Sequence, residues 1–127
     1  MRIEHVAIST RDLERLREFY ERYFGATAGS RYENPRKQFL SYFLTFDGGA
    51  RLELMQSPAV AQEGMKEVIG GFAHISRRDR FRAGCRRPDN QTTRGRLHRV
   101  DGPRRTGDGY YESVVLDPDG NRIEITA

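Results

Sequence analysis

The first quarter of the chain carries two patterns of hydrophobic and polar positions. Residues 2–9 alternate between the two sides of an extended chain, which predicts a strand covered on both faces. From Asp12, which offers an N-cap oxygen, apolar residues recur at helical spacing until Gly25 supplies a left-handed stop. The apolar stripe consists of Leu13, Leu16, Phe19, Tyr20 and Tyr23. We therefore predict a helix of about three turns whose aromatic side chains pack into the core.

Further strand patterns follow the helix. Residues 39–46 and 50–56 predict two strands joined by a tight hairpin at Asp47-Gly48-Gly49, and residues 27–33 predict a weaker strand. Proline and glycine then interrupt the pattern, which indicates a linker. We predict one domain over residues 1–127 with module one at 1–57, a linker at 58–71 and module two at 72–127.

The second half of the chain repeats the first. The segment Glu4-His5-Val6-Ala7-Ile8-Ser9 is echoed by Ala73-His74-Ile75-Ser76, and residues 49–54 are echoed by Gly120-Asn121-Arg122-Ile123-Glu124-Ile125. His5 precedes Glu53 by 48 positions and His74 precedes Glu124 by 50. This period indicates an internal duplication in which each copy reads strand, helix and three strands, an α+β fold.

Four residues stand at equivalent positions of the two copies: His5, Glu53, His74 and Glu124. Taken singly, a strand histidine or glutamate is usually structural or solvent-exposed. Pseudo-twofold symmetry, however, could bring all four to one point. Two imidazoles and two carboxylates suit Zn²⁺, Ni²⁺, Co²⁺ or Mn²⁺ and leave coordination positions for water or substrate. We therefore predict an open, catalytic kind of metal site.

Length and composition exclude several classes of protein. A chain of 127 residues is expected to form one domain, and its one cysteine, Cys85, excludes an internal disulfide framework and a zinc site built on several thiolates. No apolar run approaches the roughly 18 residues of a membrane span, and the N-terminus lacks the pattern of a signal peptide. We expect a cytoplasmic protein with no membrane partner.

The net charge of +4 comes from one short window. Residues 77–99 hold nine arginines and two aspartates, a charge of +7, so the rest of the chain carries −3. The basic balance therefore gives no general argument for a nucleic-acid partner, and none is expected.

The same window lacks the helix that the duplication requires after His74. One interpretation is a solvated basic loop, which could contact phosphate. The interpretation we favour is a shifted reading frame, because arginine codons read one base later give Val, Ala, Asp, Glu or Gly. Back-translation of residues 79–99 in that frame permits a string with apolar residues at 85, 88 and 92, which correspond to Leu16, Phe19 and Tyr23. The permitted string predicts a helix that ends at an Asp-Gly stop. The residues of the given frame lack this pattern, so the helix of the second module is doubtful.

The chain resembles the vicinal oxygen chelate superfamily, which includes glyoxalase I, fosfomycin-resistance proteins, extradiol dioxygenases and bleomycin-binding proteins. The resemblance is carried by residues 3–8, by Asp12-Leu13 through Phe24-Gly25, by residues 51–54, by Ala73-His74-Ile75 and by residues 116–124, which read L-D-P-D-G-N-R-I-E. It implies two βαβββ modules whose sheets curl around a metal, commonly in a homodimer.

Within that superfamily the set His5, Glu53, His74 and Glu124 most resembles bacterial glyoxalase I. This resemblance implies a lyase that isomerises the hemithioacetal of methylglyoxal and glutathione, or another thiol, to a lactoyl thioester. One divalent metal ion would stabilise the enediolate. A carboxylate is the expected base, with Glu124 as first choice and Glu53 as its partner.

Three other interpretations of the function remain open. A fosfomycin-modifying enzyme would use His5, His74 and Glu124 as a three-ligand site and leave Glu53 as an extra carboxylate. An extradiol dioxygenase would need a 2-His-1-carboxylate iron site and usually a longer chain. A metal-free small-molecule-binding protein of the bleomycin-resistance kind would have no use for two symmetric pairs of histidine and glutamate.

Overall fold

The computed structural model describes residues 2–60, 73–78, 97–107 and 109–126 of the chain. The helix expected after His74, and the shifted frame invoked for it, therefore lie outside the described residues. Within the described segments, no helix is long and apolar enough to cross a membrane.

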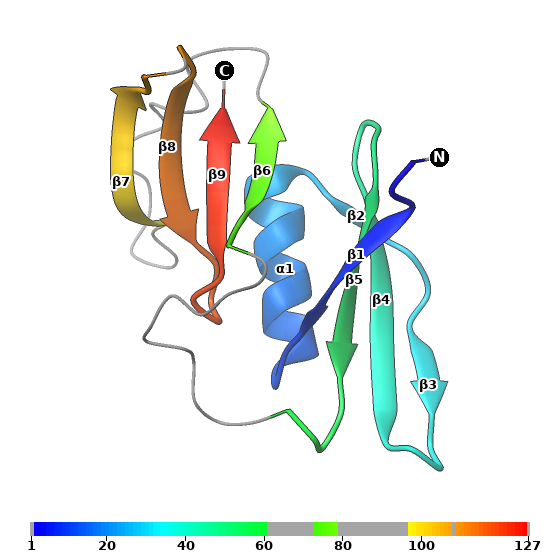
Figure 1. Cartoon of the computed structure of the whole chain (residues 1–127). Coiled ribbons are helices and arrows are strands. Elements are labelled where there is room, and N and C mark those ends of the chain that lie inside the picture. Colours follow the sequence, from blue (N-terminus) through cyan, green and yellow to red (C-terminus); the bar gives the residue numbers. More distant parts are fainter. Residues whose placement is uncertain (1, 61–72, 79–96, 108, 127) are drawn as a thin grey trace. The chain divides into compact units, whose positions relative to one another are not determined.

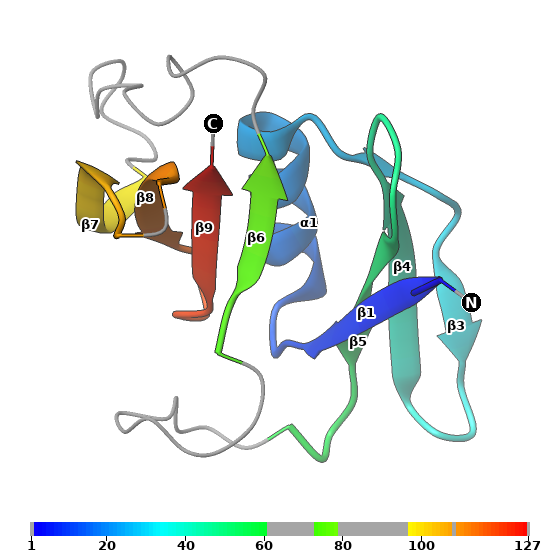
Figure 2. The same cartoon turned by 45° about the horizontal axis from the view of Figure 1, so that its top comes forward.

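The chain divides into two compact units, Met1–Glu63 and Gly64–Ala127. The elements in chain order are β1 (His5–Ser9), α1 (Leu13–Phe24), β2 (Thr27–Ala28), β3 (Tyr32–Asn34), β4 (Phe39–Thr45), β5 (Arg51–Gln56), β6 (Ile75–Arg78), β7 (His98–Arg105), β8 (Tyr111–Leu116) and β9 (Arg122–Thr126). The first five strands form one sheet and the last four form another, as Figures 1 and 2 show. The predicted α+β class, with two mixed sheets, is confirmed.

The first sheet has the strand order β1-β5-β4-β2, with β3 also paired to β4. β1 and β5 run parallel, and the other pairs are antiparallel. Gly49, at a φ of 87°, turns the chain between β4 and β5, as the hairpin prediction requires. The predicted weak strand at 27–33 is instead two short strands, β2 and β3, because the chain pairs first with one end of β4 and then with the other.

Helix α1 contacts β5, β4 and β2 and so covers one face of this sheet. It begins after Asp12, whose side chain accepts a hydrogen bond from the backbone N–H of Arg15, and it ends at Gly25 in the left-handed conformation. The predicted stripe is buried except for Tyr23, which is half-buried, and Phe24 joins it. From the sheet, Leu52 and Leu54 pack on the same side and are almost fully buried.

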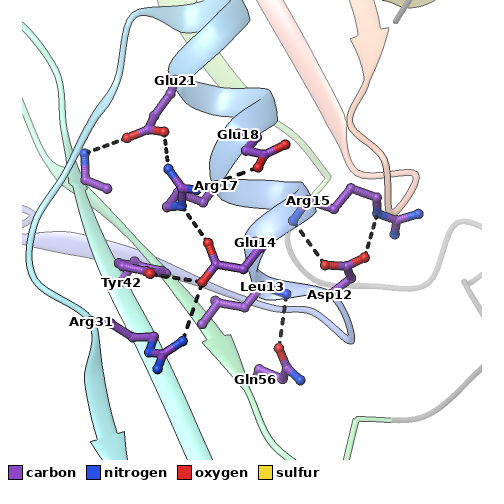
Figure 3. Close-up of polar contacts among 11 residues, drawn as sticks. Asp12, Leu13, Glu14, Arg15, Arg17, Glu18, Glu21, Arg31, Tyr42 and Gln56 are labelled. Atoms are coloured by element: carbon purple, nitrogen blue, oxygen red, sulfur yellow. Dashed lines mark hydrogen bonds and ion pairs between the residues drawn. The ribbon is translucent and has the colours of Figure 1, made fainter. Parts of the chain in front are cut away.

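Polar contacts tie the first half of α1 to the sheet (Figure 3). The hydroxyl of Tyr42 on β4 donates to Glu14 Oε1 at 2.9 Å, and Arg31 Nη1 lies 3.8 Å from the same oxygen. One turn along the helix, Arg17 Nε donates to Glu14 Oε2 at 2.8 Å and also pairs with Glu21. Helix α1 is therefore attached to the sheet by buried apolar contacts and, beside them, by hydrogen bonds and ion pairs.

The second sheet has the order β6-β9-β8-β7, with β6 and β9 parallel. The two edge strands of this sheet, β6 and β7, hold residues that the sequence pattern did not predict as strand. Arg77 and Arg78 continue β6, and His98 and Arg99 begin β7, although all four belong to the arginine-rich window. Backbone pairing to β9 and β8 explains this, because a ladder of hydrogen bonds needs no particular side chain.

Two tight backbone features shape this second sheet. In the turn before β9, Asp117 Oδ1 accepts from the N–H of Asp119 at 3.0 Å and of Asn121 at 2.8 Å, which fixes the entry to the strand that carries Glu124. In β7 the pairing with β8 shifts register around Gly102, whose φ is 78°. A Cβ there would lie 2.6 Å from the carbonyl oxygen of Glu112, so only glycine fits.

Candidate metal centre

The first unit brings His5 and Glu53 to the same face of its sheet. His5 is the first residue of β1, and the parallel register pairs Ala7 of that strand with Glu53 of β5. Side chains alternate along a strand, so Glu53 points away from the helix that covers its neighbours Leu52 and Leu54. Nε2 of His5 lies 3.8 Å from Oε2 of Glu53, whose side chain is only 15% exposed.

Glu4 and Phe43 contact the imidazole of His5, and Arg51 contacts both of them. Nδ1 of His5 is hydrogen-bonded to Oε2 of Glu4, and Arg51 Nε donates to Oε1 of the same carboxylate at 2.7 Å. The hydrogen bond from His5, followed by that from Arg51, holds the pKa of Glu4 below its usual value of 4.5. Phe43 packs edge-on against the imidazole with ring centroids 5.3 Å apart, and the Arg51 guanidinium lies over Phe43 at 4.1 Å.

The second unit holds the corresponding pair. His74 directly precedes β6, whereas His5 lies within its strand, and Glu124 is the central residue of β9. Nε2 of His74 lies 3.5 Å from Oε2 of Glu124. Ser76, which is paired with Glu124 in the parallel register, donates its hydroxyl to Oε1 of Glu124 at 3.1 Å. The hydroxyl leaves Oε2 as the oxygen that faces the imidazole.

The two distances fit a pair of metal ligands better than a direct hydrogen bond. Hydrogen bonds from a ring nitrogen to an oxygen are usually 2.7–3.2 Å long. Two donor atoms that each lie about 2.1 Å from one ion are about 3.4 Å apart at a tetrahedral angle, and farther apart at wider angles. Separations of 3.8 Å and 3.5 Å therefore leave room for one ion beside each pair. The donor types, imidazole nitrogen and carboxylate oxygen, suit a borderline divalent metal.

The structure thus joins the four predicted ligands as two pairs, one in each unit. Among the residues that the structure describes, no group of three or more His, Cys, Asp or Glu side chains is close enough to hold a metal. A four-ligand site therefore requires both pairs and remains a prediction.

Sequence analysis missed the side chains that support these pairs, among them Ser76 and Glu4. Ser76 follows His74 by two positions and so shares its face of the strand, which is a readable signal, but the first copy has Ala7 there and offers no pattern to match. Glu4 stands next to His5 in the sequence, yet adjacent strand residues normally point to opposite faces. Because Glu4 precedes the first residue of β1, it escapes that rule.

A cluster of charged side chains lies near Glu124 on the same sheet. Arg104 of β7 pairs with Asp101 at 2.9 Å and with the buried carboxylate of Glu112 at 3.0 Å. The hydrogen bond from Arg104 lowers the pKa of Asp101, and that of Arg104 is raised chiefly by Asp101, with smaller effects of Glu112 and Glu124. The bulge at Gly102 brings this arginine to Glu112, so sequence spacing could not predict the pair.

Comparison with solved structures shows the fold of glyoxalases. A glyoxalase family protein from Enterococcus faecalis has a TM-score of 0.76 at 19% identity, with 98% of this chain and 96% of that chain covered. The trypanothione-dependent glyoxalase I of Leishmania major has a TM-score of 0.72 at 22% identity, with coverage of 99% and 86%. Glyoxalase I of Zea mays has a TM-score of 0.78 at 21% identity, and this chain covers 44% of that larger protein. At these identities the likeness concerns the fold alone.

Comparison at the level of sequence assigns the family. No curated protein sequence matches the chain. The family model described as the Glyoxalase/Bleomycin resistance protein/Dioxygenase superfamily matches residues 2–125, which is almost the whole chain and includes both histidine–glutamate pairs. The chain belongs to the Glyoxalase/Bleomycin resistance protein/Dioxygenase superfamily.

Proposed function

We propose that the protein is a glyoxalase I-like metalloenzyme that isomerises a hemithioacetal of methylglyoxal and a thiol to a lactoyl thioester. The observation that carries the proposal is the recurrence of one pair, an imidazole Nε2 facing a carboxylate Oε2 within 3.8 Å, at equivalent strand positions of both units. We propose that the two pairs together bind one divalent ion, either within one chain or across a homodimer. Glutathione is the first thiol to test.

The donor set fits Zn²⁺, Ni²⁺, Co²⁺ or Mn²⁺. When bound, such an ion supplies positive charge that stabilises an enediolate developing on the substrate. Proton transfer is the task of the chain's own carboxylates. Glu124 is the proposed base: it would take the proton from the carbon next to the carbonyl and return it to the neighbouring carbon. Ser76 donates to Oε1 of Glu124, which leaves Oε2, the oxygen that faces His74, as the proposed proton acceptor.

A direct assay tests the reaction. The 127-residue chain is loaded separately with Ni²⁺ and Zn²⁺, and formation of the lactoyl thioester from methylglyoxal is measured with glutathione and with one alternative thiol. We expect turnover with at least one metal and one thiol, and its loss after chelation. Binding of a divalent ion without isomerisation of either hemithioacetal would contradict the reaction but not the metal site.

Glutamate variants then distinguish the proposed roles. Glu124→Gln should reduce kcat by about 10²–10⁴-fold, the range in which a general base contributes. Glu53→Gln should chiefly weaken metal binding, because it removes the carboxylate that faces His5. A fosfomycin-modifying enzyme with three ligands would instead retain its metal affinity in Glu53→Gln, and modification of fosfomycin by the same preparation would support that function. Glu18→Gln, on the exposed side of α1, is the matched control.

A further inference from the structure

The two histidines of the proposed metal site are held differently. His5 has a carboxylate partner, Glu4, at Nδ1, and this carboxylate is itself held by Arg51. The residue before His74 is Ala73, which has no polar side chain, and none of the described residues makes a hydrogen bond to Nδ1 of His74. The duplicated strands are therefore equivalent in their ligands but not in the support behind them.

The contacts of Glu4 determine which ring nitrogen of His5 carries the proton. An ionised carboxylate only accepts hydrogen bonds, so Nδ1 must donate. In the neutral imidazole, Nε2 then bears the lone pair, and it is Nε2 that faces Glu53 at 3.8 Å. Arg51 pairs with Glu4 through both Nε and Nη2, which holds the carboxylate against the ring.

The ring is also held in place from a second direction. Phe43 packs against the imidazole edge-on, and the same guanidinium that holds Glu4 covers the face of Phe43. Rotation of the imidazole away from Glu53 would break the hydrogen bond to Glu4 and the contact with Phe43 together. His5 is thus oriented before any ion binds, which lowers the cost of binding.

We propose that Glu4 is a positioning residue that fixes the tautomer and direction of the His5 ring for metal binding, with Arg51 holding Glu4 in place. This role rests on the proposed function, since it presumes that His5 is a ligand. Loss of such a partner typically lowers metal affinity about 10–100-fold. Because Glu4 is 57% exposed, we expect the low end of that range, about tenfold.

The test uses the metal-free chain of 127 residues, with Zn²⁺ as the probe. Its Kd is measured by competition with a chelating dye for the wild type, Glu4→Ala, Glu4→Gln and Glu33→Ala. Glu4→Ala should raise the Kd about tenfold, and Glu4→Gln should raise it less, because the amide oxygen still accepts from Nδ1–H. Glu33→Ala is the matched control: it removes a carboxylate of similar exposure, 54%, from β3 at the far side of the same sheet, and should leave the Kd unchanged.

A second measurement needs no metal. Nitrogen-15 shifts of the histidine rings in the metal-free protein should report Nδ1–H for His5 in the wild type and a mixture of tautomers in Glu4→Ala. Equal Zn²⁺ affinity and an unchanged His5 tautomer in Glu4→Ala would overturn the role of Glu4 and leave the proposed function standing. A wild-type chain that binds no divalent ion would overturn the proposed function and this role with it.

Discussion

Oε2 of Glu53 lies 3.8 Å from Nε2 of His5, across the parallel pair of strands β1 and β5. This distance is too long for a hydrogen bond and suits two ligands of one ion. The same geometry recurs between Glu124 and His74 at 3.5 Å. In the proposed function each unit would supply a two-ligand half-site. Two ligands alone seldom hold a metal tightly, since protein sites for these ions ordinarily use three or four.

If one ion is shared by both half-sites, loss of either histidine should abolish metal binding. We expect one Zn²⁺ per chain in the wild type and almost none in His5→Ala or in His74→Ala. The loss of Zn²⁺ affinity should be larger than the loss of about 10–100-fold that is typical when a partner of a metal ligand is removed. Zn²⁺ content after dialysis measures this. His98→Ala removes the third histidine, an exposed residue at the start of β7, and should retain the metal. Loss of only half the metal in each variant would indicate separate sites.

Ser76 should strengthen the half-site of the second unit through its hydrogen bond to Glu124. A hydrogen bond to a charged group contributes about 1.5–3 kcal/mol, and less where the donor is solvent-exposed, as Ser76 is. We expect Ser76→Ala to weaken Zn²⁺ binding about tenfold. Calorimetric titration of the metal-free chain measures the change. Ser9→Ala, an exposed serine in β1, is the control, and an equal loss in both variants would contradict a specific role.

The parts of the fold that were predicted correctly depend on local signals. The cap at Asp12, the stop at Gly25 and the apolar stripe between them lie within one segment, so α1 could be read from the sequence. The ends of β6 and β7 could not, because pairing with β9 and β8 extends them into arginines that carry no strand pattern. Tertiary pairing decides strand bounds more often than helix bounds.

The candidate site follows the same division. The duplication revealed His5 and Glu53 and their counterparts, because a repeat places equivalent residues at equivalent strand positions. The supporting contacts differ between the copies. Glu4 and Arg51 support the histidine of the first copy, whereas Ser76 supports the glutamate of the second. Comparison of the copies reveals only what they share, so it could not predict these contacts.

Gly102 should be intolerant of any side chain. Its φ of 78° is unfavourable for other residues, and an added Cβ would lie 2.6 Å from the carbonyl oxygen of Glu112. We expect Gly102→Ala to destabilise the protein by about 1–3 kcal/mol, as judged by urea unfolding. Gly107→Ala is the matched control, since its Cβ would meet nothing within 4 Å. Equal unfolding midpoints for the two variants would show that β7 relaxes around the bulge.

The contacts of Glu14 should make the stability of the first unit depend on pH. The hydrogen bond from Arg17, followed by that from Tyr42, holds the pKa of Glu14 below 4.5 in the folded chain. The stabilisation is therefore complete above the unfolded value, near 4.5, and disappears as the pH falls through the lower, folded value. Glu14→Gln should unfold at a lower temperature than the wild type at pH 7, by an amount equivalent to about 0.2–1 kcal/mol, because the pair is half exposed. The difference should shrink below pH 4.5. Thermal unfolding of both proteins between neutral and acid pH measures this difference in stability. The more exposed Glu18→Gln is the control. A difference that persists undiminished in acid would show that lost packing, rather than lost charge, is responsible.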